Sequence, residues 1–187
     1  MILDEIFPTP IWIFDLEFDL GSIEYWCRRK KEEDTGRDVS NIGGWQSNDI
    51  EEFDGTPLEP FIEWVEHEVT HLADDLGCRG DYPKMDNLWI NINPKGGFNQ
   101  PHVHPVSRFS GVFYIKAQEN SGDLCFTRDD NDYALGSICP DNTRYSSAQW
   151  LYKPKMNRAI LFPSWVKHQV LPNESEEDRI SLAFNLR

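Results

Sequence analysis

The stretch QPHVHPVS, residues 100–107, places two histidines one residue apart, at His102 and His104. A third, His168, comes just after the apolar run NRAILFP at 157–163. In an extended strand, residues two apart point to the same face, so His102 and His104 can offer two imidazoles to one metal ion. A tight pair with one distant histidine is the arrangement expected of a barrel whose strands meet over one cavity. We therefore predict a metal site at these three histidines, although imidazole is also a common hydrogen-bonding group.

The last segment, DRISLAFNLR at 178–187, presents two different faces. Strand alternation places one apolar set, Ile180, Leu182, Phe184 and Leu186, opposite a second set, Arg179, Ser181, Ala183 and Asn185. If the second face lines a cavity that holds a small ligand, Arg179 can bind a carboxylate through two charge-assisted hydrogen bonds, and the Ser181 hydroxyl can add another. The alternative is an exposed strand face.

The motif HEVTH at 67–71 matches the HExxH pattern of zinc peptidases, in which two histidines four residues apart share a helical face with a glutamate base. In the helix that we predict over 57–77, however, the apolar stripe centres near Val65, and His67 and His71 fall on the opposite side. A peptidase buries its histidine pair beneath a cleft and takes a third ligand from a later segment, for which no signature follows. We therefore predict that both histidines face solvent.

The elements that position these groups follow from the spacing of the apolar residues. We expect an extended segment at 6–18, a short helix at 22–34 with Ser22 at its start, and a longer helix that stops at Gly77. Further on, short apolar or alternating runs broken by Gly, Pro, Asn and Asp are typical of antiparallel strands. These runs are 87–93, 108–117, 122–127, 148–152, 157–163 and 178–187.

Two helices followed by about eight strands predict a mainly β fold with flanking helices, a cupin-like double-stranded β-helix or jelly roll with the helices packed outside. The length of 187 residues is typical of one domain. We expect a single domain over 1–187, in which 1–84 supplies an N-terminal strand and supporting helices and 85–187 forms the β-helix core that carries the site.

The composition excludes several classes of protein. A hydrophobic content of 39% is too high for a disordered chain, and no apolar run is long enough to span a bilayer. The formal charge of −14 argues against a nucleic-acid partner, because such binding needs clustered Lys and Arg. The basic run RRKK at 28–31 is followed at once by EED and is typical of a solvated helix end.

The start of the chain carries no basic segment followed by an apolar core, so we expect a cytoplasmic location. The cysteines are widely scattered and lack CxxC spacing, which favours reduced thiols over a disulfide framework or a zinc site. They stand at Cys27, Cys78, Cys125 and Cys139.

The order His102, Tyr114, His168, Arg179 and then Ser181 resembles the Fe(II)/2-oxoglutarate-dependent dioxygenases, particularly their prolyl-hydroxylase-like branch. The stretches IFPTPIWIFDL, HVHPVSRFSGVFYI and AILFPSWVKHQVLPN, together with DRISLAFNL, are similar to a family of 2-oxoglutarate oxygenases found in bacteria and marine phages. This resemblance covers nearly the whole chain. If the chain is encoded by a phage, its location is the host cytoplasm.

The resemblance implies a chemistry and a set of roles. Fe(II) is expected on His102, His104 and His168, with 2-oxoglutarate chelating it through the keto-acid end. The far carboxylate is expected on Arg179, Ser181 and Tyr114, with Asn91 also at the cofactor. Trp89, Phe113 and Trp165 are possible pocket walls, for which core packing is the alternative. The implied reaction hydroxylates a C–H bond of an unidentified small molecule or protein side chain and releases succinate and CO2.

The departure from the superfamily pattern is at position 104, where an aspartate or glutamate is expected. Three alternatives follow: His104 ligates the metal, water takes its place, or a remote carboxylate such as Asp129 or Asp130 does. We favour ligation by His104, although an imidazole there widens the choice of metal to Ni, Zn or Cu.

Two other classes of protein compete with the oxygenase. One is a cupin-like three-histidine protein that does not use 2-oxoglutarate, suggested by Gly96, which stands with five residues between it and His102. Cupins, however, place a glutamate shortly after the HxH pair, where this chain has Arg108 and Phe109, and they need no equivalent of Arg179. The other is a structural protein that keeps the fold without a metal.

Overall fold

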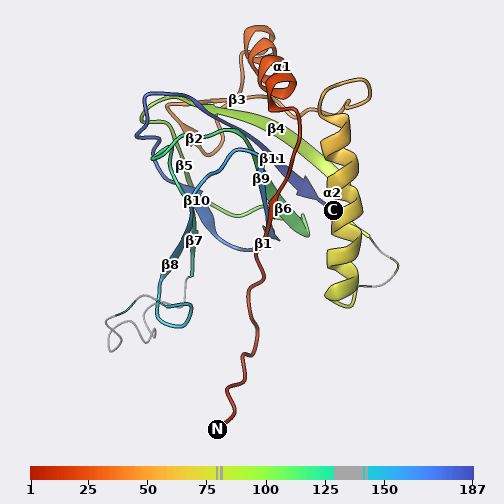
Figure 1. The fold of residues 1–187 in the computed structure, drawn as a ribbon, viewed down its shortest axis with the longest axis vertical. Helices are drawn as coiled ribbons and strands as arrows, with labels where there is room; N and C mark the ends of the chain where they lie inside the picture. The colour runs from red at the N-terminus through yellow and green to blue at the C-terminus, as the bar shows by residue number, and fades with distance from the viewer. Residues whose placement is uncertain (79, 81, 129–140, 142) are drawn as a thin grey trace.

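The computed structural model describes residues 1–78, 80, 82–128, 141 and 143–187 (Figure 1). This part of the chain forms helices α1 and α2 and strands β1 to β11. Their bounds are β1 Trp12–Asp15, α1 Leu20–Glu33, β2 Asn41–Ile42, β3 Trp45–Gln46, α2 Glu59–Asp75, β4 Met85–Asn93, β5 Phe98–His102, β6 Phe109–Lys116, β7 Leu124–Thr127, β8 Gln149–Tyr152, β9 Arg158–Pro163, β10 His168–Val170 and β11 Arg179–Leu186.

The strands form two antiparallel sheets. The six-stranded sheet has the order β1-β9-β6-β11-β4-β3, and the five-stranded sheet has the order β2-β5-β10-β7-β8. Strands distant in sequence are neighbours: β11 pairs with both β4 and β6, and β10 pairs with both β5 and β7. The predicted mainly β fold with flanking helices, a double-stranded β-helix, is confirmed by this arrangement.

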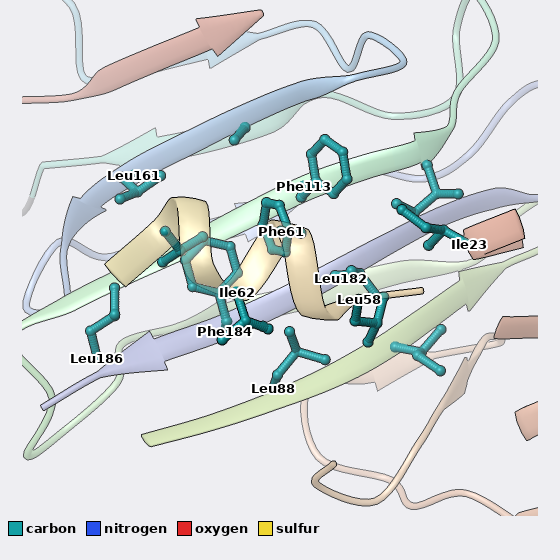
Figure 2. Close-up of a cluster of buried hydrophobic side chains, with 14 of the residues drawn as sticks. Ile23, Leu58, Phe61, Ile62, Leu88, Phe113, Leu161, Leu182, Phe184 and Leu186 are labelled. Atoms are coloured by element: carbon teal, nitrogen blue, oxygen red, sulfur yellow. The ribbon is translucent and has the colours of Figure 1, made fainter. Parts of the chain in front are cut away.

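Helix α2 covers the outer face of the six-stranded sheet (Figure 1). Figure 2 shows Phe61 of α2 against side chains of β6 and β11. The Phe61 ring stacks on Phe113, with centroids 4.4 Å apart, and meets Phe184 edge-on at 5.6 Å. Phe61, Phe113 and Phe184 are fully buried, and such rings account for a large part of the apolar area that folding removes from water.

The ends of both helices follow local chemistry. The α1 N-cap is Asp19, whose side chain accepts hydrogen bonds from the N–H groups of Gly21 and Ser22, so the helix begins earlier than Ser22, where we predicted its start. Gly77 has a left-handed φ of +79° and follows the last turn of α2, as its role as a stop predicts.

The six predicted core runs match strands β4, β6, β7, β8, β9 and β11, but β5 and β10, which carry His102 and His168, were not among these runs. Within the extended segment expected at 6–18, only Trp12–Asp15 pairs as a strand. The glycine-rich stretch 41–49 contains two short strands that we did not predict. The first, β2, pairs with β5, and the second, β3, pairs with β4, so this stretch is hydrogen-bonded to both sheets.

Neither α1 nor α2 combines the length and the apolar character needed to cross a membrane. Among the described cysteines, Cys27 and Cys125 are buried and Cys78 is exposed, and all three are free thiols. Cys139 lies outside the described residues.

Candidate metal and ligand site

Three histidine side chains meet in a cavity lined by both sheets. The ligand atoms of His102, His104 and His168 all lie within 4.8 Å of one another, and the Nε2 atoms of His104 and His168 are 3.3 Å apart. In the part of the chain that the structure describes, this is the one cluster of three or more metal-ligating side chains. The histidines singled out from spacing therefore come together in space.

The three histidines are positioned in two different ways. His102 and His168 are direct cross-strand partners on β5 and β10. Strand β5 ends at His102, so His104 lies beyond the strand, and the prediction that strand alternation places it was wrong. His104 reaches the cluster from the following turn, where its backbone N–H donates to the carbonyl of Ser164 at 3.1 Å. That hydrogen bond fixes the turn beside the segment that leads into His168.

Backbone carbonyls set the orientation of two of the rings. The Nδ1 atom of His102 lies 2.7 Å from the carbonyl of Gln100, and that of His168 lies 2.9 Å from the carbonyl of Val166. A neutral imidazole that donates from Nδ1 keeps the lone pair on Nε2, which suits it to bind a metal. The Nε2 atoms of these rings are therefore left as acceptors for the cluster.

Burial keeps the cluster uncharged. It lowers the pKa of His104 to about 4 and that of His168 to about 3, in both cases with a further contribution from neighbouring histidines. Burial also lowers the pKa of His102. At neutral pH the three rings are neutral imidazoles, which is the form that coordinates metal ions.

A second polar group lines the same cavity from the six-stranded sheet. Ser181 on β11 pairs with Asn91 of β4 on one side and with Tyr114 of β6 on the other, so these three side chains form a row across the sheet. Arg179 stands two residues before Ser181 and shares its face. All four are buried. The residues that the sequence assigned to a ligand carboxylate are therefore neighbours in one wall.

Arg179 is a buried cation without an acidic partner. Its Nη1 donates to the carbonyls of Ser121 at 2.6 Å, Gly122 at 3.1 Å and Leu171 at 3.4 Å. Among the described residues, no carboxylate pairs with it, and no cavity-lining residue is acidic. Burial lowers the pKa of Arg179 to about 10, so it stays charged at neutral pH. A buried charge is ordinarily paired, so this environment favours an anionic ligand.

Two polar atoms beside Arg179 also lack partners. Within the described chain, the Tyr114 hydroxyl and the Asn91 Oδ1 are buried and make no hydrogen bond. Burial raises the pKa of Tyr114 to about 12, so its hydroxyl is a neutral donor at physiological pH. An unpaired buried polar group costs about 1–3 kcal/mol, which makes these atoms suited to bind a ligand or ordered water.

The structure corrects two of the expected pocket walls. Trp89 lines the cavity, with its ring centroid 5.7 Å from that of His104. Phe113 does not: it stacks on Phe61 in the core on the opposite face of the sheet. Trp165 is 66% exposed and is not part of the lining. Adjacent strand residues point to opposite faces, so Phe113 and Tyr114 cannot share one cavity wall.

Sequence reasoning missed Asn99 and Ser40, which also line the cavity. The pairing of β5 with β10 shifts register, because His102 faces His168 while Asn99 faces Val170. Three steps along β5 therefore match two along β10, which is a β-bulge. The signal that was available is Pro101, since proline within a strand is typical of edges and bulges.

The HEVTH motif lies away from this cavity. His67 and His71 are both exposed, so the prediction that they face solvent is confirmed. The carboxylates considered as substitutes for His104, Asp129 and Asp130, lie outside the described residues.

The comparisons with known proteins agree with this geometry. The family model described as "Putative 2OG-Fe(II) oxygenase" matches residues 87–185, which is more than half of the chain and includes both the histidines and Arg179. Among curated proteins, no sequence matches.

Several solved structures share the fold. A prolyl-4-hydroxylase from Pseudomonas putida is 17% identical, with a TM-score of 0.71 over 96% of this chain and 92% of that one. A viral collagen prolyl hydroxylase from Paramecium bursaria Chlorella virus-1, in complex with 2OG, is 11% identical with a TM-score of 0.61 over 95% of each chain. HygX from Streptomyces hygroscopicus, with nickel and 2-oxoglutarate bound, is 10% identical, with a TM-score of 0.62 over 95% of this chain and 82% of that one.

Proposed function

We propose that this chain, which belongs to the putative 2OG-Fe(II) oxygenase family, is a dioxygenase that hydroxylates a C–H bond of a substrate still to be identified. The cofactors of that family, Fe(II) and 2-oxoglutarate, are those expected from the sequence. One observation carries the proposal: a neutral three-imidazole cluster and a buried arginine without a carboxylate partner among the described residues line the same cavity.

The residues present fit both cofactors. We propose His102, His104 and His168 as the metal ligands, because imidazole nitrogen suits Fe(II) and two of the rings are already oriented by backbone carbonyls. An imidazole at position 104 keeps the protein ligands uncharged, so the negative charge around the ion comes from 2-oxoglutarate. The alternative in which water replaces His104 is less favoured, because its Nε2 is already 3.3 Å from that of His168.

We propose that Arg179 binds the far carboxylate of 2-oxoglutarate. In the described chain its hydrogen bonds come from Nη1, which leaves Nε and Nη2 for the ligand. Ser181 and Tyr114 are placed to donate their hydroxyl protons to the same carboxylate, and Asn91 lies beside them. A guanidinium and hydroxyl donors in a site away from water bind a carboxylate more strongly than they do in solvent.

When bound, Fe(II) and 2-oxoglutarate would supply the oxidation by O2, in which one oxygen atom enters the substrate and the other enters succinate as 2-oxoglutarate loses CO2. The protein holds the metal, orients the co-substrate and excludes water. Phe162 and Phe126 serve the last purpose, since their ring centroids lie 4.7 Å and 6.1 Å from that of His168.

For the substrate we propose a small molecule or a protein side chain. Two of the similar structures are prolyl hydroxylases, which supports the second class. The charge of −14 disfavours nucleic acid. We further propose that residues 1–187 form one 2OG-Fe(II) oxygenase-like domain that acts in the cytoplasm, where its free thiols stay reduced.

Anaerobic titration tests the function. We expect Fe(II) and 2-oxoglutarate together to give a metal-to-ligand charge-transfer band, and aerobic incubation to release succinate. His168→Ala should abolish the band, and Arg179→Ala should weaken 2-oxoglutarate binding while Fe(II) still binds. Arg158→Ala is the matched control, because Arg158 pairs with Asp15 at the edge of the sheet. Wild-type protein that gives no band, or an Arg179→Ala variant that binds 2-oxoglutarate as well as wild type does, contradicts the proposal.

Position 104 needs its own variants. If His104 ligates the ion, His104→Ala should weaken Fe(II) binding, and His104→Asp should restore it with a shifted charge-transfer band. Unchanged Fe(II) affinity in His104→Ala would favour the alternative in which water occupies that position.

A further inference from the structure

The HEVTH motif brings two imidazoles together on the exposed side of α2. The Nε2 atoms of His67 and His71 are 3.2 Å apart, and their rings cross at 85° with centroids 4.6 Å apart. Residues four apart share one face of a helix, so the backbone itself sets this spacing. The opposite side of the helix is fixed in the core through Phe61, Val65 and Val69, which are fully buried. The pair is therefore carried by a rigid segment.

The separation of the two nitrogens fits a metal ion. Two Zn–N bonds of about 2.0–2.1 Å at a tetrahedral angle place their nitrogens about 3.3 Å apart. The His67–His71 separation of 3.2 Å is close to this value, and it nearly equals the 3.3 Å between His104 and His168 in the cavity. In the absence of an ion, the two rings can share one hydrogen bond. The side-chain rotamers of His67 and His71 can therefore be the same with and without a bound ion.

We propose that His67 and His71 form a second metal site, which binds a late first-row divalent ion such as Zn²⁺, Ni²⁺ or Cu²⁺ through two imidazole nitrogens. Neutral imidazole prefers these ions over Mg²⁺ or Ca²⁺. Among the described residues, no third ligand atom joins the pair within 4.8 Å, so water completes the coordination. This site lacks the third protein ligand and the cleft of a peptidase centre.

The number of bound ions tests the proposal. In equilibrium dialysis against Zn²⁺ followed by metal analysis, His67→Ala and His71→Ala should each bind one ion fewer than wild type. His168→Ala, which removes a residue of the cavity cluster, should keep the ion on α2. Glu68→Ala is the matched control within the motif and should match wild type. Equal zinc content in wild type, His67→Ala and His71→Ala would overturn the second site, whatever the cavity binds.

Gly122 lies in the loop that holds Arg179 and has a φ of +92°. A Cβ atom at this position would lie 2.5 Å from the Nη1 of Arg179 and 2.9 Å from the carbonyl oxygen of Pro172, and it would lie closer still to the carbonyl oxygen of Leu171. Separations this short do not occur between a Cβ atom and its neighbours, so any side chain here would displace the guanidinium or the backbone that accepts its hydrogen bonds. The absence of a side chain is what allows Arg179 to lie against these carbonyls.

We infer that Gly122 is a positioning residue for 2-oxoglutarate, an inference that rests on the proposed function. It lets the carbonyls of Ser121, Gly122 and Leu171 hold Nη1, and these hydrogen bonds aim the remaining guanidinium N–H groups at the ligand carboxylate. A guanidinium fixed in advance loses less conformational freedom when it binds, which favours affinity.

Gly122→Ala should weaken 2-oxoglutarate binding about tenfold or more in the anaerobic Fe(II) titration, as expected when Arg179 no longer donates at least one hydrogen bond to the carboxylate. Fe(II) affinity should not change, and the KM for 2-oxoglutarate should rise more than kcat falls. The matched control is Gly96→Ala, because Gly96 has a similar φ of +83°, but a Cβ atom there would have no other atom within 4 Å.

The outcomes separate the positioning role from the proposed function. Wild-type protein that fails to bind 2-oxoglutarate overturns the proposed function. If wild type binds and Gly122→Ala binds equally well, only the positioning role is overturned. Should Gly122→Ala not fold, Arg179→Lys provides the second test, since lysine lacks the planar fork that the carbonyls and the ligand share, and it too should raise the KM for 2-oxoglutarate.

Discussion

Alternate residues of β11 meet two different environments. Leu182 and Phe184 pack against α2 in an apolar core. Arg179 and Ser181, on the other face, line a cavity with polar atoms that have no hydrogen-bond partner in the described part of the chain. Figure 2 shows the first face, where Phe61 of α2 fills the space over the sheet. One face packs against the protein itself, and the other presents polar groups that are free to bind a ligand. Under the proposed function, the same strand contributes to stability on one side and to binding on the other.

The largest effect is expected on the core face. Phe61→Ala removes a ring that contacts Phe113 and Phe184, so it should lower the free energy of unfolding by about 3–5 kcal/mol. The molecules that remain folded should keep their affinity for 2-oxoglutarate. Chemical denaturation and ligand titration measure the two quantities. Glu63→Ala, on the exposed side of α2, is the control and should change stability by less than about 0.5 kcal/mol.

Arg179→Met should have the reverse effect, with a larger loss of ligand affinity than of stability. It removes the charge that we propose binds 2-oxoglutarate, so the affinity for this co-substrate should fall by about 100-fold or more, as expected for a lost charge-assisted pair. Stability should fall less than in Phe61→Ala, because methionine fills a similar volume and removes a buried cation, which partly offsets the loss of the hydrogen bonds to the carbonyls of Ser121, Gly122 and Leu171. Calorimetric binding and thermal melting measure the two effects. A variant that unfolds while the residual folded protein binds normally would show that Arg179 belongs to the core.

Tyr114→Phe removes a single oxygen atom from the cavity face, so it should weaken ligand binding without lowering stability. The hydroxyl is buried without a partner in the described chain, so removing it should leave the free energy of unfolding unchanged or raise it by up to about 1 kcal/mol. The same change should weaken 2-oxoglutarate binding by about tenfold, because it removes the hydrogen bond that we propose Tyr114 donates to the carboxylate. Urea denaturation and the anaerobic Fe(II) titration measure the two quantities. A marked loss of stability would mean that the hydroxyl is satisfied in the ligand-free protein.

The smallest effect is expected at an exposed ion pair on the edge of the same sheet, between Arg158 and Asp15. No such acidic partner is found for Arg179 among the described residues. Hydrogen bonds from Arg158 and then Lys155 hold the pKa of Asp15 below its ordinary value of 3.8. The folded state therefore binds fewer protons than the unfolded state, and the contribution of this carboxylate is present above about pH 4 and lost as the pH falls below it.

Wild type should accordingly be slightly more stable than Asp15→Asn at neutral pH, and the difference should shrink as the pH is lowered through this range and with added salt. Thermal melting of both proteins across this range measures it. A difference that does not depend on pH would assign the effect of Asp15 to packing rather than to charge.

Alternation within strands explains how much of this arrangement the sequence predicted. The faces of β11 and the placement of Trp89 and Asn91 on β4 follow directly from a period of two. The same rule, applied consistently, would have excluded Phe113 from the cavity once Tyr114 was placed there. Those positions were predictable because β11 pairs with β4 without a register shift from Arg179 to Asn185, and because one face of each strand is apolar.

The histidine cluster was predictable only in part. The residue types and order pointed to a site, but the reason given for His104 was incorrect, because β5 ends at His102 and a turn supplies the next histidine. Asn99 could not be found by alternation, since the bulge between β5 and β10 shifts its parity. The hydrogen bonds of Arg179 to three carbonyls depend on loops distant in sequence, which no local pattern predicts.

The segment from β2 to β3 joins the two sheets through one short turn. Strand β2 hydrogen-bonds to β5 in one sheet and β3 to β4 in the other, and Ser40 and Asn99 line the cavity on the β2 side. Arg179 and Tyr114 lie on β11 and β6, which pair with neither strand, whereas Asn91 is the partner of Gln46 in β3. We therefore expect substitutions on the β2 side to alter which substrate the cavity accepts, and substitutions in β3 to reach the proposed co-substrate contacts as well.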